Sequence, residues 1–307
     1  MTANIPGGVW PTMITPFTDA GEIDDAALER LIDWYIAHGV SGLFAVCQSS
    51  EMFFLSLEER TRLAAFVKAK AAGRVPVIAS GHISDGLDAQ VMELRRMAET
   101  GVDALVLITN RLARADEPDD VWRRNMAPLM SELPPDVPLG LYECPYPYKR
   151  LLSPELLAWA AQTGRFLFLK DTSCDADQIK AKLNAVRHTP LRIYNANSAT
   201  LLHTLKMGVH GYSGVMANFH PSLYVRLAEC WASRPADAEA LADMLSMMSL
   251  IEKQLYPVNA KYHLMLEGVL DSVASRAQDH RQLTATHRME VEQLRRISDR
   301  MMRAFPT

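Results

Sequence analysis

Short apolar runs recur along the chain at intervals of about twenty to thirty-five residues, and each is followed by a turn and a longer amphipathic segment. The runs are apolar at nearly every position rather than at alternate positions, which is typical of parallel strands that helices cover on both faces. We therefore predict eight parallel strands, at residues 8–17, 42–49, 75–82, 103–110, 137–145, 166–170, 191–197 and 211–218.

The segments between these runs have the periodicity of helices. Segment 24–39 repeats apolar residues at three- and four-residue spacing and begins with two acidic residues. Segment 57–72 follows Ser56, and Glu59 lies three residues after that serine, which is the pattern of a capping box. Eight strand–helix units predict an α/β protein with the (β/α)8 TIM barrel fold, for which about 250 residues is a typical size.

The C-terminal part of the chain contains helical patterns and no strand. The stretches "DAEALADMLSMMSLIEKQLY" and "HRMEVEQLRRISDRMMRAF" place apolar residues, many of them Met, at helical spacing. Such Met residues indicate core packing or a subunit interface rather than a cofactor site. We expect residues 1–220 to form the barrel strands and most helices, and residues 221–307 to form the last barrel helix and a helical extension within one structural unit.

Composition narrows the classes of function. The 307 residues are 49% hydrophobic and 22% charged, with a formal net charge of -4, and the Lys and Arg residues are dispersed, so we expect no nucleic-acid partner. The chain shows no apolar run of the roughly 18 to 20 residues that span a bilayer, and its N-terminus lacks the regions of a signal peptide, so we expect a cytoplasmic protein without a membrane partner. The four Cys residues show no paired spacing and predict reduced thiols.

A lysine closes the sixth apolar run. Residues 166–169 are all apolar, and Lys170 and Asp171 follow them directly. Reactive groups of a TIM barrel lie at the C-terminal ends of its strands, and burial there would lower the pKa of the amine so that it can attack a carbonyl and form a Schiff base. The alternative is that Lys170 begins a loop and points to solvent or to Asp171.

Two further features lie at corresponding strand ends. Tyr142 lies near the end of the fifth run, which Pro145 ends just after it, and a phenol there can transfer the proton that aldol chemistry requires, although an ordinary strand aromatic would look the same. The second run ends in "CQSSE", Cys47 to Glu51, whose hydroxyls and backbone N–H groups can bind a carboxylate. A surface turn without a ligand is the alternative for that segment.

Together these features resemble the dihydrodipicolinate synthase and N-acetylneuraminate lyase family, which are class I aldolases that form a Schiff base with pyruvate or another 2-oxo acid in a TIM barrel. The similarity runs from "TMITPF" at Thr12 to the helical C-terminus. Its most specific part is the 28-residue step from Tyr142 in "YECP" to Lys170 in "KDTS". The resemblance implies that Lys170 is the Schiff-base lysine and Tyr142 the general acid/base, and that no metal or organic cofactor is needed.

The resemblance also implies which residues bind substrate. Ser49 and Ser50, with Gln48 before them, fall in the turn that binds the carboxylate of the 2-oxo acid in the family, and Thr172 falls where the neuraminate lyase branch has a threonine facing the substrate. Polar residues after the seventh and eighth runs contact the distal part of the substrate in the family. Here these residues are Asn195, Asn197 and Ser213.

The sequence departs from the family pattern at three places. Gln48 replaces the first hydroxyl of the turn, which links the tyrosine into a proton relay in the best-known members. The tyrosines that follow the fourth strand in the synthase branch are replaced by "NRLA". Pro147 occupies the place of the arginine for a dicarboxylate substrate, with Lys149 and Arg150 close enough in sequence to substitute for it. These differences argue against a role in lysine biosynthesis.

We therefore predict a Schiff-base lyase or aldolase that cleaves or forms a carbon–carbon bond in a 2-oxo acid, with pyruvate as the small product or substrate. Two alternatives stay open, namely a dehydratase of a 2-oxo-deoxy sugar acid that uses the same imine, and a barrel that binds a 2-oxo acid without turnover. Met52, Phe53, Phe54 and Tyr146 would make the mouth of the site apolar, unless they pack between helices. The resemblance and the Met-rich C-terminal helices together predict a homotetramer.

Overall fold

The computed structural model describes residues 5–305 as a parallel eight-stranded sheet with the strand order β1-β8-β7-β6-β5-β4-β3-β2. Hydrogen bonds close the sheet into a barrel, because Ser41 N donates to Val9 O at 2.8 Å and Met13 N donates to Phe44 O at 3.0 Å. The predicted (β/α)8 fold is confirmed. The strands are β1 (Gly8–Val9), β2 (Leu43–Phe44), β3 (Val77–Ala79), β4 (Ala104–Ile108), β5 (Leu139–Tyr142), β6 (Phe166–Asp171), β7 (Arg192–Asn195) and β8 (Gly211–Tyr212).

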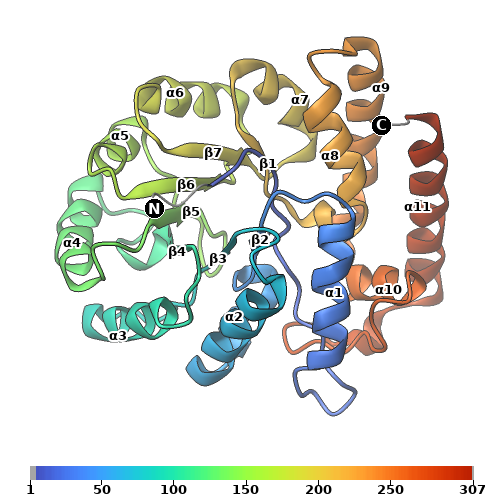
Figure 1. Ribbon diagram of the computed structural model, residues 1–307, viewed down its shortest axis with the longest axis horizontal. Helices are drawn as coiled ribbons and strands as arrows, with labels where there is room; N and C mark the ends of the chain where they lie inside the picture. Colours follow the sequence, from blue (N-terminus) through green and yellow to red (C-terminus); the bar gives the residue numbers. More distant parts are fainter. Residues whose placement is uncertain (1–4, 306–307) are drawn as a thin grey trace.

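A helix follows each strand and covers the outside of the barrel (Figure 1). The capping box predicted for the second helix is confirmed, since Glu59 N donates to Ser56 Oγ at 3.2 Å and Ser56 N donates to the Glu59 carboxylate at 2.8 Å. The barrel helices are α1 (Asp25–Ala37), α2 (Leu57–Ala71), α3 (Leu87–Ala98), α4 (Asp119–Glu132), α5 (Pro154–Gln162), α6 (Ala176–Val186), α7 (Ser198–Met207) and α8 (Pro221–Cys230).

The first and last strands are shorter than the apolar runs that predicted them. Strand β1 has two residues, and Pro11, which follows it, has no amide hydrogen to continue the ladder. Strand β8 also has two residues, after which the chain turns into the short 3-10 helix η4 (Val215–Asn218). An apolar run thus marks a buried segment, whereas the hydrogen-bonded ladder covers only part of it.

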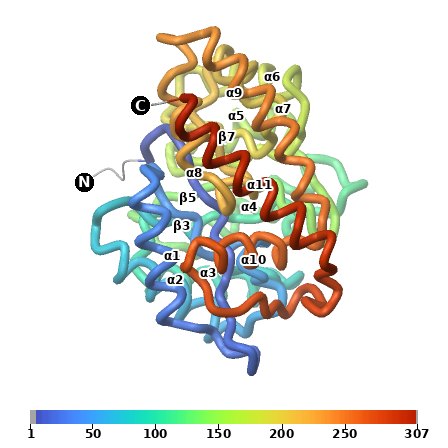
Figure 2. Tube along the Cα trace, turned by 90° about the vertical axis from the view of Figure 1, so that its right-hand side faces the viewer, coloured from blue at the N-terminus to red at the C-terminus, as the bar shows by residue number. Residues whose placement is uncertain are grey.

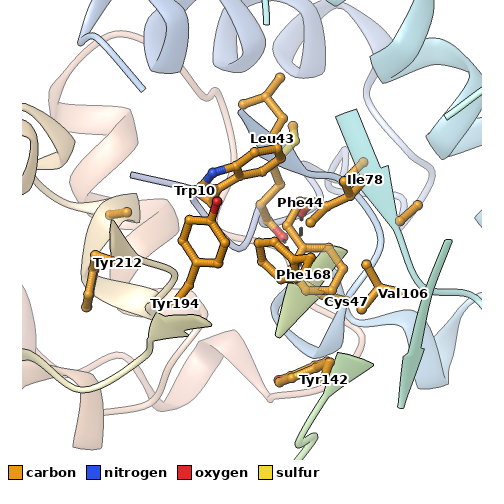
Figure 3. Close-up of a cluster of buried hydrophobic side chains, with 14 of the residues drawn as sticks. Trp10, Leu43, Phe44, Cys47, Ile78, Val106, Tyr142, Phe168, Tyr194 and Tyr212 are labelled. Atoms are coloured by element: carbon orange, nitrogen blue, oxygen red, sulfur yellow. Dashed lines mark hydrogen bonds between the residues drawn. The ribbon is translucent and has the colours of Figure 1, made fainter. Parts of the chain in front are cut away.

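The barrel interior is filled by side chains (Figure 3). The Phe168 and Tyr194 rings stack with centroids 4.5 Å apart, and Trp10 packs edge-on against both. Phe44 lies edge-on to Tyr142, at 5.6 Å between centroids. This aromatic cluster forms a dry floor beneath the C-terminal ends of β5 and β6.

The C-terminal extension lies beside the barrel rather than apart from it. It comprises α9 (Pro235–Met248), the 3-10 helix η5 (Ser249–Lys253), α10 (Val258–Leu266), the 3-10 helix η6 (His280–Gln282) and α11 (Ala285–Ala304). Helix α11 packs on α8 and α10, as Figures 1 and 2 show. Within residues 5–305, no helix is long and apolar enough to cross a membrane.

The helical pattern over residues 237–256 breaks in the structure. Helix α9 ends at Met248, η5 follows it, and Leu255 has a positive φ of 44°. Pro257 accounts for the absence of helix just before it, because a proline removes an amide donor and disfavours the helical conformation of the preceding residue. As a result, η5 and the residues after it turn toward the C-terminal ends of the strands.

Candidate active site

One cavity of about 470 Å³ opens at the C-terminal ends of the strands. Its floor includes Lys170 and Tyr142, which are directly paired between β6 and β5. One wall comes from the turn after β2 and the loop after β5. The rest of the wall includes the C-terminal extension, through η5, Tyr256 and residues 277–278. The cavity is therefore built by both the barrel and the extension.

Lys170 is buried at the base of this cavity. Its side chain is 3% exposed, and its Nζ lies 4.7 Å from the centroid of the Tyr142 ring. It forms no hydrogen bond or ion pair within residues 5–305, so the alternative in which Lys170 points to solvent or to Asp171 is wrong. Burial lowers the pKa of Lys170 to about 8, against a smaller opposing effect of Cys47, Cys144 and Glu252. A useful fraction of the amine is therefore neutral near neutral pH.

Tyr142 is as buried as Lys170, and burial is the main reason that its pKa lies well above the ordinary value. The neighbouring Cys144 acts in the same direction, partly through a hydrogen bond with the phenol. Cys144 Sγ also donates to Gln48 Oε1 at 3.5 Å. Gln48, Cys144 and Tyr142 therefore form a row of hydrogen-bonding groups where the family has a relay of hydroxyls. The sequence did not single out Cys144 for this position.

The turn after β2 presents Ser49 and Gln48 to the cavity but not Ser50. The turn is a 3-10 helix, η1 (Gln48–Ser50), and Ser49 Oγ donates to Thr12 Oγ1 at 3.3 Å. Ser50 Oγ lies 2.7 Å from the carbonyl oxygens of Met13 and Ala45, and it accepts a hydrogen bond from Cys47 N. The hydroxyl of Ser50 therefore holds the shape of the turn.

Glu51 fixes this turn to the C-terminal extension. It has a left-handed backbone with φ 61°, it is 1% exposed, and its carboxylate lies 2.6 Å from Lys261 Nζ. The other carboxylate oxygen accepts hydrogen bonds from the backbone N–H groups of Arg276 and Ala277 and from the Ser275 hydroxyl. The position of the turn therefore depends on residues more than two hundred positions later in the chain.

A buried ion triad lies at the ends of β5 and β6. Lys182 Nζ lies 2.5 Å from Glu143 and 2.6 Å from Asp171, and these two carboxylates directly follow Tyr142 and Lys170 in the sequence. Glu143 also accepts a hydrogen bond from Thr172 N at 3.0 Å, and Thr172 Oγ1 donates to Glu143 O at 2.6 Å. Thr172 lines the cavity, although its hydroxyl hydrogen is already used. The triad holds the ends of β5 and β6 in a fixed register.

Besides Ser50, three more of the predicted substrate contacts do not line the cavity. Asn195 donates to the hydroxyls of Thr200 and Thr204 and accepts from Asn197 N, so its amide is fully used within the fold. Asn197 caps α7 by accepting a hydrogen bond from Thr200 N. Ser213 is buried outside the cavity lining, which at these strand ends is formed by the small residues Ala196 and Gly214.

Lys149 and Arg150, and a buried histidine after β3, also have structural partners. His82 accepts a hydrogen bond from Ile108 N at 2.7 Å through Nε2, and its Nδ1 contacts Gln90 at 3.1 Å. The Arg150 guanidinium contacts Asp119 at 3.0 Å and is 5% exposed, so it does not replace the arginine of the synthase branch. Lys149 Nζ donates to Thr172 O at 2.8 Å.

Two groups of residues with different chemistry line the mouth of the cavity. Phe53 and Tyr146 pack edge-on at 4.8 Å between centroids and line one side together with Phe54, whereas Met52 is buried away from the cavity. The second group comprises the charged residues Glu252 and Lys253 and the phenol of Tyr256. The sequence did not indicate that these three residues belong to the site. Their sequence signal was only helical periodicity, which does not reveal that this segment reaches the barrel mouth.

Tyr256 connects this wall to the turn. Its hydroxyl accepts a hydrogen bond from Asn218 Nδ2 at 3.0 Å and also hydrogen-bonds with Ser49. A carboxylate placed against η1 would meet the Ser49 hydroxyl and this phenol. Within residues 5–305, no three His, Cys, Asp or Glu side chains are grouped in a way that would hold a metal ion.

The chain is similar in sequence to members of one protein family. The sequence profile of the Dihydrodipicolinate synthetase family matches residues 5–294. A 4-hydroxy-tetrahydrodipicolinate synthase of Gluconacetobacter diazotrophicus is 28% identical over 235 residues, which cover 76% of this chain and 77% of the relative. The corresponding enzyme of Laribacter hongkongensis is 27% identical over 264 residues, which cover 83% of this chain and 87% of the relative.

Solved structures share the fold. YagE of E. coli K12, a prophage protein of the dihydrodipicolinic acid synthase family solved with pyruvate, superposes with a TM-score of 0.84 at 22% identity, covering 96% of this chain and 98% of YagE. The dihydrodipicolinate synthase of Acinetobacter baumannii, also solved with pyruvate, gives a TM-score of 0.85 at 21% identity, covering 96% and 99%.

Proposed function

Because the chain belongs to the dihydrodipicolinate synthetase family of enzymes, we propose that it is a class I lyase in which Lys170 forms a Schiff base with a 2-oxo acid. The observation that carries this proposal is the state of Lys170. It is a buried amine with a lowered pKa and no ion-pair partner within residues 5–305, at the base of a cavity and next to Tyr142. A structural lysine at such a position would be paired, as Lys182 and Lys261 are.

The substrate carboxylate binds at η1. Ser49 and the backbone of the turn supply hydrogen-bond donors, and the Tyr256 phenol lies beside them. The turn is held in place by Ser50 and by the Glu51–Lys261 ion pair, so it needs little rearrangement when the ligand binds. In this position the C2 carbonyl of the 2-oxo acid faces Lys170.

The imine forms in two proton-balanced steps. The neutral amine of Lys170 attacks C2, and a proton moves from nitrogen to oxygen to give a neutral carbinolamine. Tyr142 then donates its phenolic proton to the departing hydroxyl, so that water leaves and a protonated iminium remains. The raised pKa of Tyr142 keeps the phenol protonated until this step.

The Tyr142 phenolate then acts as the base. It accepts the proton of the C4 hydroxyl while the C3–C4 bond breaks, and the bonding electrons move into the iminium to give an enamine and an aldehyde. Protonation of the enamine at C3 and hydrolysis of the imine release pyruvate and restore the Lys170 amine. The reverse sequence condenses pyruvate with an aldehyde.

Borohydride trapping tests the proposal directly. With pyruvate and borohydride, the wild-type protein should gain one reduced pyruvate per chain by intact mass, and peptide mapping should place it on Lys170 rather than on Lys253, the other lysine of the cavity lining. Lys170→Ala should lose the adduct, whereas Lys206→Ala, an exposed lysine on α7, should keep it. An adduct that persists in Lys170→Ala, or none on the wild type, would refute the proposal.

Turnover separates a lyase from a barrel that only binds a 2-oxo acid. A panel of 4-hydroxy-2-oxo acids with pyruvate release as the readout should show multiple turnovers in the wild type. Tyr142→Phe should reduce the rate by about 10²- to 10⁴-fold, the usual cost of losing an acid/base group. Trapping without any turnover across the panel would favour the binding protein.

A further inference from the structure

Glu252 is a carboxylate that lines the catalytic cavity without a partner. It lies in η5, is partly buried, and forms no hydrogen bond or ion pair within residues 5–305. The other carboxylate of the cavity lining, Glu51, is fully used by Lys261 and by backbone N–H groups of the extension. A partly buried carboxylate without partners has no role in holding the fold, because desolvation without compensation only costs free energy.

The charge of Glu252 acts on the reacting groups. Burial raises its pKa, while Lys170 and Lys253 lower it, and in return Glu252 is one of the groups that raise the pKa of Lys170. It also raises the pKa of Tyr256, beside the proposed carboxylate site. Glu252 lines the same cavity as Lys170, so its charge borders the space that the part of a substrate beyond C3 must occupy.

The neighbouring cation does not cancel this charge. Lys253 also lines the cavity, but it is exposed, and the field of an exposed ammonium is weakened by water and salt. Phe53, Phe54 and Tyr146 line the same cavity with aromatic side chains that carry no charge. The distal part of a substrate thus meets both aromatic surface and a negative hydrogen-bond acceptor.

We propose that Glu252 is a specificity-determining residue that accepts hydrogen bonds from hydroxyl groups on the distal part of the substrate and excludes substrates with a second carboxylate there. The preferred class is a neutral, hydroxyl-bearing 2-oxo acid. This inference rests on the proposed imine at Lys170, and it adds the chemical class of the substrate to it. A second carboxylate would be placed against a like charge in a partly desolvated cavity, which is unfavourable.

A competition between two matched 2-oxo acids tests the inference and needs no turnover. We would use 2-oxo-5-hydroxypentanoate and 2-oxoglutarate, which share a carbon chain and differ only at C5, where one has a hydroxyl and the other a carboxylate. With both at equal concentration, borohydride trapping and intact mass give the ratio of the two adducts. The wild type should favour the hydroxy acid, and Glu252→Gln should shift the ratio toward 2-oxoglutarate by about tenfold.

Two control variants define the outcome. Glu252→Asp keeps the charge and should keep the preference, and Glu155→Gln, an exposed position on α5, changes the net charge equally and should not shift the ratio. A pyruvate adduct on Glu252→Gln would show that this variant is folded and reactive. An unchanged ratio in that variant would overturn this inference alone. Absence of any adduct on the wild type would overturn the proposed function and this inference with it.

Discussion

Lys170 is activated by burial rather than by a neighbouring cation, because desolvation is the largest effect on its pKa and the nearby groups oppose it. The neutral amine is the minor form at a pH below the pKa of Lys170 and the major form at a pH above it. The rate of imine formation at low pyruvate concentration should therefore increase as the pH rises, with a midpoint near 8. Glu252→Gln removes an anion that raises this pKa, so its midpoint should lie at lower pH. A wild-type midpoint at the ordinary lysine value of 10.5 would contradict the assignment.

Cys144 is expected to position Tyr142 rather than to react itself. Burial raises the pKa of its thiol to about 11, which keeps the sulfur protonated and able to donate to Gln48. Cys144→Val removes this donor at similar volume, and we expect a fall in kcat of roughly tenfold, less than the cost of losing an acid/base group. Cys144→Ser should retain most of the rate.

The readout that identifies a positioning role is the difference between two measurements. Imine trapping at Lys170 should be the same in Cys144→Val and in the wild type, because the amine and the carboxylate site are intact. A parallel loss of trapping and turnover would instead show that the substitution disturbs the whole cavity.

The placement of residues could be predicted from the sequence where it depends on a strand end. The step from Tyr142 to Lys170 brings both residues to the floor of one cavity, because parallel strands end at one edge of the barrel. The same reasoning predicted that Asn195 and Asn197 line the cavity, and they do not. A polar residue at a strand end can equally hydrogen-bond to the following helix, as both do here. The sequence around Glu252 does not indicate a site residue, because only the tertiary fold brings η5 to the cavity.

Elements were predictable where the periodicity was strong and local. The capping box at Ser56 and the acidic start of α1 fixed the beginnings of helices, because these signals depend on a few neighbouring residues. The break between α9 and η5 was not predicted. The apolar pattern continues across residues 249–253, where the chain forms a 3-10 helix and Ile251 O accepts a hydrogen bond from Asn259 Nδ2, a tertiary contact that the local pattern does not reveal.

The ion pair between Glu51 and Lys261 should be one of the strongest links between the turn and the extension. Glu51→Gln leaves a buried ammonium without its counter-charge and weakens three further hydrogen bonds, so we expect the free energy of unfolding to fall by about 3 kcal/mol. The lowered pKa of Lys261, about 8, limits the loss because the amine can release its proton. Urea unfolding measures the change.

Glu155→Gln is the matched control, because that carboxylate is exposed on α5. It should leave the free energy of unfolding within about 0.5 kcal/mol of the wild type. If Glu51→Gln also costs less than about 1 kcal/mol, which is typical of an exposed pair, then this ion pair does not link the two elements energetically.

At the scale of the whole molecule, we predict a homotetramer. The extension exposes Met247 and Leu250, which line a groove together with residues of α11. Exposed apolar side chains grouped on one face are typical of subunit interfaces. Light scattering at micromolar concentration should give the mass of four chains, and the double substitution Met247→Lys and Leu250→Lys should lower it. A 34.3 kDa species in the wild type would contradict the prediction.

The lining of the cavity argues against efficient condensation of pyruvate with aspartate semialdehyde, the reaction of dihydrodipicolinate synthase. Two relatives of the chain nevertheless carry the name 4-hydroxy-tetrahydrodipicolinate synthase. That substrate has a carboxylate that needs a cationic partner. Pro147 stands at the place of the family arginine, and the guanidinium of Arg150 is held by Asp119. The only lysine of the described cavity lining besides Lys170 is the exposed Lys253, whose charge is weakened by water.

The proton relay is altered as well, since Gln48 replaces a hydroxyl and reaches Tyr142 only through a thiol. Losing one positioned acid/base group costs about 10²- to 10⁴-fold in rate. We therefore expect a borohydride-trappable pyruvate imine together with turnover of aspartate semialdehyde far below an ordinary kcat of about 10 s⁻¹. A coupled assay with pyruvate and aspartate semialdehyde measures this turnover, and a value near that ordinary kcat would show that the cavity tolerates the carboxylate without the arginine.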